Sequence, residues 1–455
     1  MAANECQKYH IAPRLAGWAA TVVGLGSSGR TAARLLCALG AHVRVLEKNP
    51  ACIDVALRDT AFAMLIARNN LEIIASDYAA AHFVDVDLVV ISPGIHPSLI
   101  TPLLPKTGPL GRPIEYIGEL ELASREVREP IVAITGTNGK TTTTTLVARF
   151  IEATGRRVFL GGNIGTPLSE YVLGETKADV LVLEVSSFQL MTCTSFHPFV
   201  AVLLNFSTNH LDWHSDLEEY LAAKLRLFTH QHIADMAVIN SDLQPLLTKR
   251  NEYIAAHTVW FKSGCRFYCK HLIGEHNHAN VEAAYQTAHM FGLTEDKAQT
   301  VLNNFHGLPH RLEHIIEKAG VLFVDDSKAT TVEALATALR SFDRPIRLLV
   351  GGVFKGGDLT RLIPLLRKKV RAVGLFGASK NIFYSAWKEQ VPLFWKSTLE
   401  SAVWQHWQEA KAGEVILLSP ATASFDLYTD YKARGQDFAR ICAALDKPER
   451  YSTPE

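Results

Sequence analysis

The sequence predicts an α/β protein of three domains, each built around a mainly parallel sheet. Short runs of Val, Ile and Leu alternate with stretches of helical pattern along almost the whole chain, as in AATVVGLG, VDLVVIS, PIVAITG and EVILLSP. Runs without strict alternation are typical of strands buried on both faces, which occur in parallel sheets covered by helices. The 455 residues are enough for about three domains of roughly 150 residues each.

Two breaks in this pattern mark the expected domain boundaries. A polar stretch, 124–130, precedes a strand that begins at Ile131, and GLPHR, 307–311, precedes a strand that begins at Val321. We therefore expect domains over 1–128, 129–308 and 309–455. In the central domain the strand leads to a helix over 141–153, and Gly155 follows its end, where glycine is common.

The composition excludes several classes of function. Hydrophobic residues make up 48%, enough for a sizeable core, and Lys+Arg equals Asp+Glu at 46 each. That balance gives no electrostatic reason to expect nucleic acid or an anionic membrane as partner. The N-terminus, MAANECQKYHIAPRL, lacks a signal-peptide pattern, and no apolar run approaches the roughly 18 residues of a membrane span. Seven scattered cysteines suit reduced thiols, so we expect a cytoplasmic protein.

One cysteine cluster invites a zinc interpretation. Cys265 and Cys269 are followed by His271, His276 and His278. The spacing is not a usual zinc pattern and no second cysteine pair follows, so we expect incidental surface residues.

GLGSSG, 24–29, lies between an apolar strand and a helix, and Glu47 follows 18 residues after Gly29 at the end of the next strand. This is the dinucleotide fingerprint, in which a pyrophosphate meets a helix N-terminus, and it favours a dehydrogenase. A tight turn without ligand is the plain alternative. Ser27 and Ser28 could equally meet another diphosphate, such as that of a nucleotide sugar. The motif alone does not decide between a dinucleotide site, a site for another diphosphate and a turn without ligand.

AITGTNGKTTTTT, 133–145, predicts a phosphate-binding loop. Backbone N–H groups would cradle the phosphates, Lys140 would reach the β/γ oxygens and Thr141 would hold Mg²⁺. The loop is shorter than a standard P-loop, since the position five before Gly139 is Ile134. Lys and Thr follow in the correct order before a helix, so we expect ATP to bind here.

Other polar residues follow predicted strands. Glu184 closes DVLVLE and suits a second Mg²⁺ contact, because strand ends line the crevice of an α/β sheet. His210 and His214, four apart, could share a helix face and bind metal, although H-E-x-x-H is absent. Lys224 reads as an ordinary solvated helix lysine. In the third domain Lys328, Lys355 and Ser424 could bind an anionic substrate, or the segments that carry them could simply cap helices.

The ordered set TGTNGKTT, GGNIG, EVSSFQL, NHLDWH, HNHAN, GLPHR, DDSKATT and SPATASFD resembles the Mur ligases of peptidoglycan synthesis over essentially the whole chain. TGTNGKT is also shared with folylpolyglutamate synthases, whereas GLGSSG, SPGI and DDSKATT are more specific. The resemblance implies a Rossmann-like N-terminal domain, a central P-loop ATPase-like domain and a Rossmann-like C-terminal domain. It implies a cytoplasmic enzyme, expected to be a monomer, that uses ATP and two Mg²⁺ ions to join D-glutamate to UDP-N-acetylmuramoyl-L-alanine.

The resemblance also assigns roles to positions of this sequence. Catalytic positions are Lys140, His210 and Lys224. The nucleotide-binding positions are Gly136, Thr137, Asn138, Gly139, Lys140, Thr141, Thr142, Asn277, Asn280, Arg311 and Asp326. The metal ligands are Thr141, Glu184, His210 and Lys224, the last matching a lysine that CO₂ carbamylates in this family. The substrate-binding positions are Ser27, Ser28, Glu47, Asn163, Ser186, Lys328, Thr330, Lys355, Ser424, Phe425 and Tyr431.

Two departures and two competing hypotheses remain. Position 209 is Asn where Asp is common, and position 422 is Thr where Cys is common, the latter with little expected consequence. GLGSSG and Glu47 motivate an NAD-dependent oxidoreductase. A nucleotide-binding protein that has lost turnover is the third possibility, and the set Lys140, Glu184, His210 and Lys224 counts against it.

Overall fold

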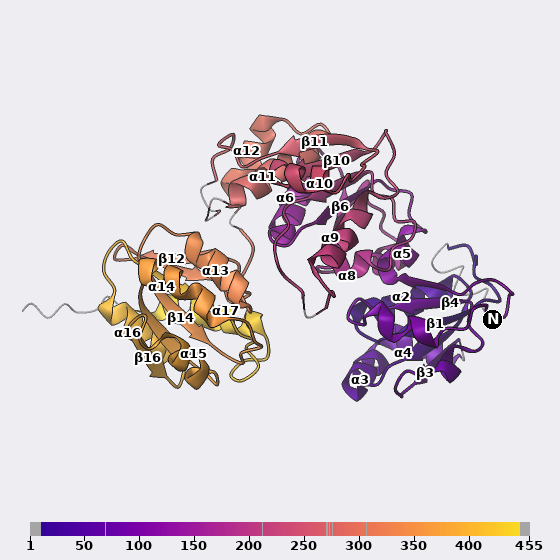
Figure 1. Cartoon of the computed structure of the whole chain (residues 1–455), viewed down its shortest axis with the longest axis horizontal. Coiled ribbons are helices and arrows are strands. Elements are labelled where there is room, and N and C mark those ends of the chain that lie inside the picture. Colours follow the sequence, from indigo (N-terminus) through magenta and orange to yellow (C-terminus); the bar gives the residue numbers. More distant parts are fainter. Residues whose placement is uncertain are drawn as a thin grey trace, which may run out of the picture. The chain divides into compact units, whose positions relative to one another are not determined.

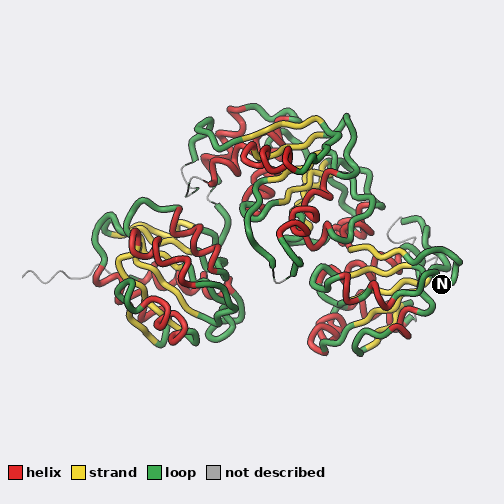
Figure 2. The backbone as a smooth tube through the Cα atoms, in the orientation of Figure 1, coloured by secondary structure: helices red, strands yellow, loops and turns green. Residues whose placement is uncertain are grey.

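A computed structural model describes residues 11–68, 70–211, 213–269, 272, 274, 276–305 and 307–445. The chain divides into two compact units, one formed by Met1–Gly264 with Ala279–Ala298 and the other by Cys265–His278 with Gln299–Glu455. Helices and strands alternate through both units (Figures 1 and 2), and the strands form three sheets. The predicted α/β class with mainly parallel sheets is therefore confirmed.

The first sheet is wholly parallel, in the order β3-β2-β1-β4-β5. Its strands are β1 (Ala19–Val23), β2 (His42–Leu46), β3 (Leu71–Ile74), β4 (Leu88–Ile91) and β5 (Glu115–Gly118), and its helices are α2 (Ser27–Ala38), α3 (Pro50–Arg58), α4 (Thr60–Ala67) and α5 (Glu119–Ser124). Every residue of β4 is buried, as the unbroken apolar run predicts.

The second sheet is also parallel, in the order β11-β10-β9-β6-β8-β7. Its strands are β6 (Ile131–Thr135), β7 (Val158–Gly162), β8 (Val180–Glu184), β9 (Val200–Leu203), β10 (Met236–Asn240) and β11 (His257–Phe261). The helices of this region are α6 (Lys140–Glu152), α7 (Leu168–Leu173), α8 (Ser187–Leu190), α9 (Leu217–Leu225), α10 (Gln244–Lys249), α11 (His276–His289) and α12 (Glu295–Asn304). Because β6, β8 and β9 are neighbours, the segments that follow them meet at one edge of the sheet.

Two buried carboxylates on α5 join the first sheet's domain to the second within the same unit. Glu119 accepts a hydrogen bond from the backbone N–H of Ser169 at 2.6 Å, and Glu121 accepts the N–H groups of Thr194 and Ser195, both at 3.1 Å. Glu121 is fully buried. Helices α2, α5 and α7 contribute to one continuous hydrophobic core, so these two parts of the unit are packed together.

The third sheet has the order β12-β13-β17-β14-β15-β16, and β12 alone is antiparallel to its neighbour. The strands are β12 (Glu313–Lys318), β13 (Val321–Asp325), β14 (Ile346–Gly351), β15 (Val370–Phe376), β16 (Leu393–Lys396) and β17 (Val415–Leu418). Helices α13 (Val332–Arg340), α14 (Ile363–Lys369) and α15 (Lys380–Trp387) pack on one face, and α16 (Leu399–Glu409) and α17 (Tyr431–Ala444) on the other. This is the doubly wound arrangement expected of a Rossmann-like domain.

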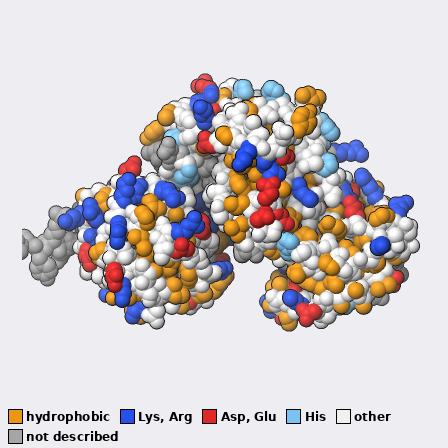
Figure 3. Space-filling model, in the orientation of Figure 1, with side chains coloured by type: hydrophobic (Ala, Val, Ile, Leu, Met, Phe, Trp, Pro, Cys, Tyr) orange, Lys and Arg blue, Asp and Glu red, His pale blue; other side chains and the backbone are white. Residues whose placement is uncertain are grey.

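The surface carries both signs of charge on the visible face of each unit (Figure 3). Within the described part of the chain, no helix is both long enough and apolar enough to cross a membrane. The boundaries 1–128, 129–308 and 309–455 each enclose one sheet, and we retain them as a proposal.

Candidate active site

The loop between β6 and α6 has the backbone of a phosphate cradle. Gly139 adopts a φ of +81°, and a Cβ atom built there would lie 2.3 Å from Asn280 Oδ1. Only glycine fits such a position without strain or movement of the neighbour. Helix α6 begins at the next residue, Lys140. The N–H groups of its first turn can therefore face an anion, as helix N-termini do at many phosphate sites.

Two lysines converge on a single backbone oxygen of this loop. Lys140 Nζ donates to the carbonyl oxygens of Gly136 at 2.9 Å and Thr137 at 3.0 Å, and Lys224 Nζ donates to the same Gly136 oxygen at 2.9 Å. Lys224 is only 1% exposed. Burial, reinforced by the charge of Lys140, lowers the pKa of Lys224 well below its ordinary value.

The interpretation of Lys224 as a solvated lysine is therefore wrong. Its ammonium lies 4.5 Å from the ring centroid of Tyr220, one helical turn earlier on α9. Tyr220 and Leu221 are buried, and the spacing i, i+3, i+4 places Lys224 on the same helix face. That spacing was visible in the sequence and could have signalled the burial.

Glu184, the last residue of β8, lies where the sequence predicts a metal ligand. Its Oε1 accepts a hydrogen bond from Asn163 Nδ2 at 2.9 Å. Its Oε2 is buried and has no hydrogen-bond partner among the described residues. Buried polar atoms are nearly always paired, so an orphaned carboxylate oxygen beside a phosphate loop fits a bound cation. Thr141, in the first turn of α6, is half-buried.

His210 and His214 lie in the loop between β9 and α9, so they do not share a helix face. His210 has a φ of +55° and packs edge-on against Phe188, with ring centroids 5.0 Å apart. His214 is buried, and its Nε2 lies 2.9 Å from Ser187 Oγ. The metal pairing of the two histidines finds no support in this geometry. Ser186 caps α8 through its bonds with Gln189.

Sequence reasoning missed Asn205, which braces the phosphate loop. Its Oδ1 accepts the N–H groups of Thr137 at 3.1 Å and Asn138 at 2.9 Å, and its Nδ2 donates to the Asn138 carbonyl at 3.0 Å. Tyr220 adds a bond from its hydroxyl to Thr137 Oγ1 at 3.2 Å. Asn205 follows an interior strand, and that position was the available signal.

A cavity of about 450 Å³ has the size of a small-molecule site and includes several predicted substrate residues. It is lined by Gly24 to Ser28, Glu47 to Asn49, Tyr78, Ser92 to Ile95, Gly162, Asn163, Gly165, Pro167 and Gln189. Both sheets of the unit contribute to it. Ser27, Ser28, Glu47 and Asn163 therefore share one cavity.

Glu47 holds the glycine-rich loop of this cavity. Its Oε2 accepts the N–H of Leu25 and its Oε1 that of Asn49, both at 2.7 Å. In a dinucleotide site the equivalent acid binds a ribose hydroxyl. Here both carboxylate oxygens are engaged by the backbone. A Cβ on Gly29 would lie 1.9 Å from the Gly24 carbonyl oxygen, so close helix–strand packing accounts for that glycine.

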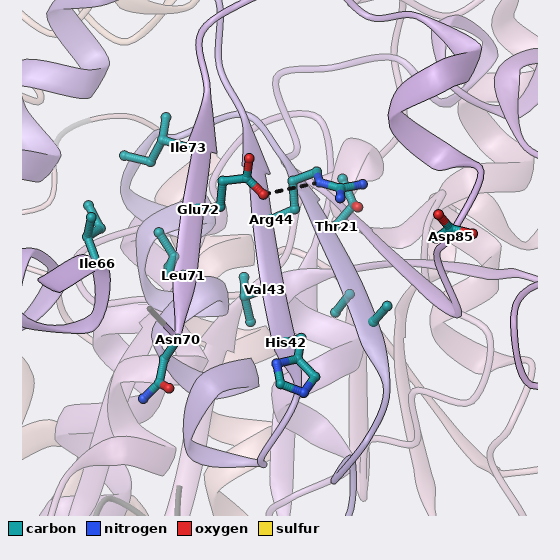
Figure 4. A pocket seen from close by; sticks show the side chains of 12 residues that line it. Thr21, His42, Val43, Arg44, Ile66, Asn70, Leu71, Glu72, Ile73 and Asp85 are labelled. Atoms are coloured by element: carbon teal, nitrogen blue, oxygen red, sulfur yellow. Dashed lines mark ion pairs between the residues drawn. The ribbon is translucent and has the colours of Figure 1, made fainter. Parts of the chain in front are cut away.

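A second cavity, of about 520 Å³, lies over β1, β2 and β3 (Figure 4). Arg44 and Glu72 form an ion pair there, with Arg44 Nε 3.7 Å from Glu72 Oε2. None of the described residues lining it is a predicted site residue, so it is separate from the candidate site.

In the third domain the predicted residues follow neighbouring strands. Asp326 accepts bonds from Ser419 Oγ at 2.8 Å and the Leu312 N–H at 3.2 Å. Burial raises the pKa of Asp326 to about 7, against the lowering effects of these bonds and of Arg311. The Lys328 ammonium lies 5.7 Å from the Tyr431 ring centroid.

The remaining third-domain residues differ in exposure. Lys355 Nζ lies 5.7 Å from the ring centroid of Phe425, which is 68% exposed. Ser424 is buried and Thr330 is half-buried. The two asparagines on α11, Asn277 and Asn280, are buried.

The described residues give the zinc interpretation no support. Cys265 is exposed and Cys269 half-buried. Among the described residues, the group with metal-ligand geometry is instead His310, Glu313 and Asp325, and these are bonded to one another: His310 Nδ1 lies 2.7 Å from Asp325 Oδ2, and the His310 N–H donates to Glu313. His271 of the cysteine cluster and Asp212 of the NHLDWH segment lie outside the described residues.

The class of protein follows from four features: a glycine-rich phosphate loop, two lysines that converge on it, a buried carboxylate oxygen without a hydrogen-bond partner among the described residues, and three sheets in an α/β fold. The Mur ligase middle domain matches residues 134–265, and the Mur ligase glutamate ligase domain matches residues 310–422. The chain belongs to the Mur ligase family.

Relatives with the name UDP-N-acetylmuramoylalanine--D-glutamate ligase are similar over nearly their whole length. That of Nitratidesulfovibrio vulgaris (strain DP4) is 50% identical over 427 residues, covering 94% of this chain and 96% of the relative. That of Lawsonia intracellularis is 44% identical over 442 residues, covering 97% and 96%.

Solved structures share the fold. The MurF ligase of Thermotoga maritima in complex with ADP gives a TM-score of 0.54 at 19% identity, covering 80% of this chain and 95% of that one. The UDP-N-acetylmuramate-alanine ligase MurC of the same organism gives 0.53 at 17%, covering 94% and 99%.

Proposed function

We propose that the chain is an ATP-dependent ligase that joins D-glutamate to UDP-N-acetylmuramoyl-L-alanine. The observation that carries the proposal is the convergence of Lys140, Lys224 and Glu184 around a phosphate loop. This arrangement occurs in a chain 50% identical to ligases with that name. We further propose that the reaction takes place in the cytoplasm, where ATP and UDP-linked precursors are available, and that the enzyme acts as a monomer.

ATP binds with its phosphates on the loop 136–142. The loop's N–H groups and the N-terminus of α6 supply fixed positive dipoles, which need no reorganisation as charge develops on the transferring phosphoryl group. Lys140 exchanges the carbonyl oxygens of Gly136 and Thr137 for phosphate oxygens. Asn205 holds the loop in the shape that allows this exchange. From the family resemblance alone, Asn277, Asn280, Arg311 and Asp326 are also proposed to bind the nucleotide.

Glu184 Oε2, Thr141, His210 and a carbamate on Lys224 are the proposed ligands for two Mg²⁺ ions. Oxygen donors suit this hard cation, and Glu184 Oε2 has an open coordination position by virtue of its missing hydrogen bond. When bound, Mg²⁺ would offset negative charge on the phosphates. Asn163 fixes the orientation of the Glu184 carboxylate through its bond to Oε1.

Lys224 is proposed to carry a carbamate. The burial that lowers the pKa of Lys224 favours the neutral amine, and only a neutral amine has the lone pair that attacks CO₂. The new N–C bond forms as the amine loses a proton, which turns a potential cation into an anion. That anion would lie near Lys140, where an opposite charge replaces a repulsion.

The bond-forming sequence follows acyl-phosphate chemistry. A carboxylate oxygen of the L-alanyl group attacks the γ-phosphorus of ATP, the bond to the bridging oxygen breaks, and ADP leaves. The deprotonated amine of D-glutamate then attacks the acyl carbon. The tetrahedral intermediate collapses to the amide as the carbon–oxygen bond to phosphate breaks.

The two remaining ends of the substrates have separate proposed sites. The cavity with Ser27, Ser28 and Glu47 takes the uridine diphosphate end, and Asn163 and Ser186 lie toward the reacting end. Lys328, Thr330, Lys355, Ser424, Phe425 and Tyr431 form the amino-acid pocket, whose lysines suit a dicarboxylate.

The test is phosphate release from ATP and Mg²⁺ with UDP-N-acetylmuramoyl-L-alanine, with and without D-glutamate. L-Glutamate and meso-diaminopimelate serve as controls, and Lys140→Ala as the inactive variant. Release that requires both substrates and prefers D-glutamate supports the proposal. Release with another amino acid keeps the ligase chemistry and overturns the assigned pocket. Unchanged ADP formation in Lys140→Ala, or no release with any amino acid, overturns the enzyme assignment.

A further inference from the structure

Arg434, on α17, is a fully buried cation with no role in the proposed chemistry. Its Nε donates to Ser327 Oγ at 2.9 Å, and its Nη2 donates to the carbonyl oxygens of Ser327 at 2.9 Å and Thr422 at 3.0 Å. Its Nη1 donates to the Gly351 carbonyl at 3.1 Å and to Thr422 Oγ1 at 3.3 Å. All three guanidinium nitrogens are therefore bonded to neutral oxygen atoms.

These acceptors belong to three separate loops. Ser327, Gly351 and Thr422 lie at or just beyond the carboxyl ends of β13, β14 and β17, and β17 lies between the other two strands in the sheet. The same loops carry Lys328, Lys355 and Ser424, which belong to the proposed amino-acid pocket. The side chain of Arg434 thus links all three loops through hydrogen bonds.

The loops also contact one another closely. Val353 and Ala423 exchange backbone hydrogen bonds of 2.8 and 3.0 Å, and the Ala421 N–H donates to the Ala329 carbonyl at 2.9 Å. A Cβ on Gly352 would lie 2.1 Å from the Ala423 carbonyl oxygen. A displacement of one loop is therefore transmitted to the others.

Burying this charge is costly, because the guanidinium makes no hydrogen bond to a carboxylate of the described residues. Burial lowers the pKa of Arg434 to about 10, while the charges of Asp426 and Asp325 act in the opposite direction. The side chain remains cationic at neutral pH. A buried charge that does not serve stability can be retained because it selects one arrangement of the groups around it.

We propose that Arg434 is a positioning residue that holds the three loops in the arrangement that binds the dicarboxylic amino acid. The inference rests on the proposed function and deepens it. Arg434 touches no substrate; it acts through Ser327, Gly351 and Thr422. Its loss should therefore weaken binding of D-glutamate specifically, because the uridine diphosphate cavity is formed by residues of the other unit.

The experiment compares Arg434→Lys with wild type and with Arg440→Ala. Arg440 lies on the same helix, and its side chain is 59% exposed. Lysine keeps the charge but cannot reach three loops with a planar fork. We expect Arg434→Lys to raise the KM for D-glutamate at least about tenfold, since small misplacements in a site are costly. The KM for UDP-N-acetylmuramoyl-L-alanine should stay within about twofold, and Arg440→Ala should match wild type.

Arg434→Ala with added guanidinium chloride tests the same idea by chemical rescue. Truncation leaves a cavity lined by the five oxygen atoms that accept hydrogen bonds from Arg434. Low millimolar guanidinium should therefore restore part of the lost affinity for D-glutamate. The same addition should leave the affinity of Arg440→Ala unchanged. If Arg434→Ala does not fold, Thr422→Val replaces it, because it removes one acceptor while keeping the guanidinium. That variant should raise the same KM by a smaller factor.

An unchanged KM for D-glutamate in a folded Arg434→Lys protein overturns the inference. Equal losses in all kinetic parameters also overturn it, since they indicate a purely structural role. Absence of D-glutamate-dependent phosphate release in wild type instead overturns the proposed function itself, so the two failures are distinguishable.

Discussion

Substitution of Gly139 by alanine should disrupt the phosphate loop by a defined amount. Two effects add at this position. Gly139 has a φ of +81°, which costs an L-residue about 1 kcal/mol. The new Cβ would also lie 2.3 Å from Asn280 Oδ1 and 3.1 Å from its Cγ. Asn280 is buried, so its side chain has little room to withdraw.

Gly155 provides a matched control for the first effect alone. It has a φ of +94°, and a Cβ built there meets no atom within 4 Å. Gly155→Ala should therefore cost only the left-handed conformation, about 1 kcal/mol. Overpacking of one methyl group adds about 1–3 kcal/mol. Gly139→Ala should thus cost about 2–4 kcal/mol in total.

The assay is thermal unfolding together with calorimetric titration of ATP. For a folding unit of this size, 1 kcal/mol corresponds to about 2–4 °C in Tm. We expect Gly155→Ala to lower Tm by about 3 °C and leave ATP affinity unchanged, and Gly139→Ala to lower Tm by about 5–10 °C and abolish detectable ATP binding. Adding Asn280→Ala to Gly139→Ala should recover about 1–2 kcal/mol relative to the sum of the single variants. Equal effects of the two glycine variants, or strict additivity with Asn280→Ala, would refute the steric argument.

Three further predictions concern buried polar groups. Lys224→Met should abolish turnover and raise Tm, because an apolar side chain of similar length replaces a buried amine. The gain in Tm should grow as pH falls below the ordinary lysine pKa. A Tm lower than that of wild type in differential scanning calorimetry would contradict this prediction. Asp326→Asn should raise stability at pH 8 by a few kcal/mol at most. The folded pKa of Asp326, about 7, lies above the usual 3.8. The stabilising contribution of Asp326 is therefore lost as pH rises through about 7, and the variant should flatten the profile of Tm between pH 4 and 7. A profile parallel to that of wild type would count against the raised pKa. Glu184→Gln should weaken Mg²⁺ binding at least about tenfold while Tm without metal is retained, as measured by titration calorimetry; unchanged affinity would remove Glu184 from the ligand set.

Local features were predictable from the sequence because neighbouring residues determine them. The loop 136–140 and the helix that follows it depend on glycine conformations and on a short strand–turn–helix segment. The interior strands of the sheets were predictable because burial on both faces requires unbroken apolar runs. Strand β12 was missed, since its sequence EHIIEK is mostly polar, as suits an edge strand.

Features that depend on tertiary contacts were not predictable in this way. Lys224 appeared solvated because a single lysine in a helix usually is. Its spacing from Tyr220 and Leu221 was the one local sign of burial, and the burial itself follows from the packing of α9 beside the phosphate loop. Arg434 lies 107 residues from Ser327 and 83 from Gly351 along the chain. No local pattern indicates which residue will link loops that far apart.

The cavity proposed to bind the uridine diphosphate end shows why the first two sheets must be held together. One wall consists of the loop after β1, and another of the loop after β7, so the cavity exists only while the two domains stay packed. Glu119 and Glu121, both at the start of α5, supply that constraint, because the backbone N–H groups of Ser169, Thr194 and Ser195 would lose these carboxylate acceptors if the domains separated. Asn163 lines the same cavity and orients Glu184. The diphosphate end and the proposed phosphoryl-transfer site are therefore positioned by one packed unit, which fixes the distance between them before any nucleotide binds.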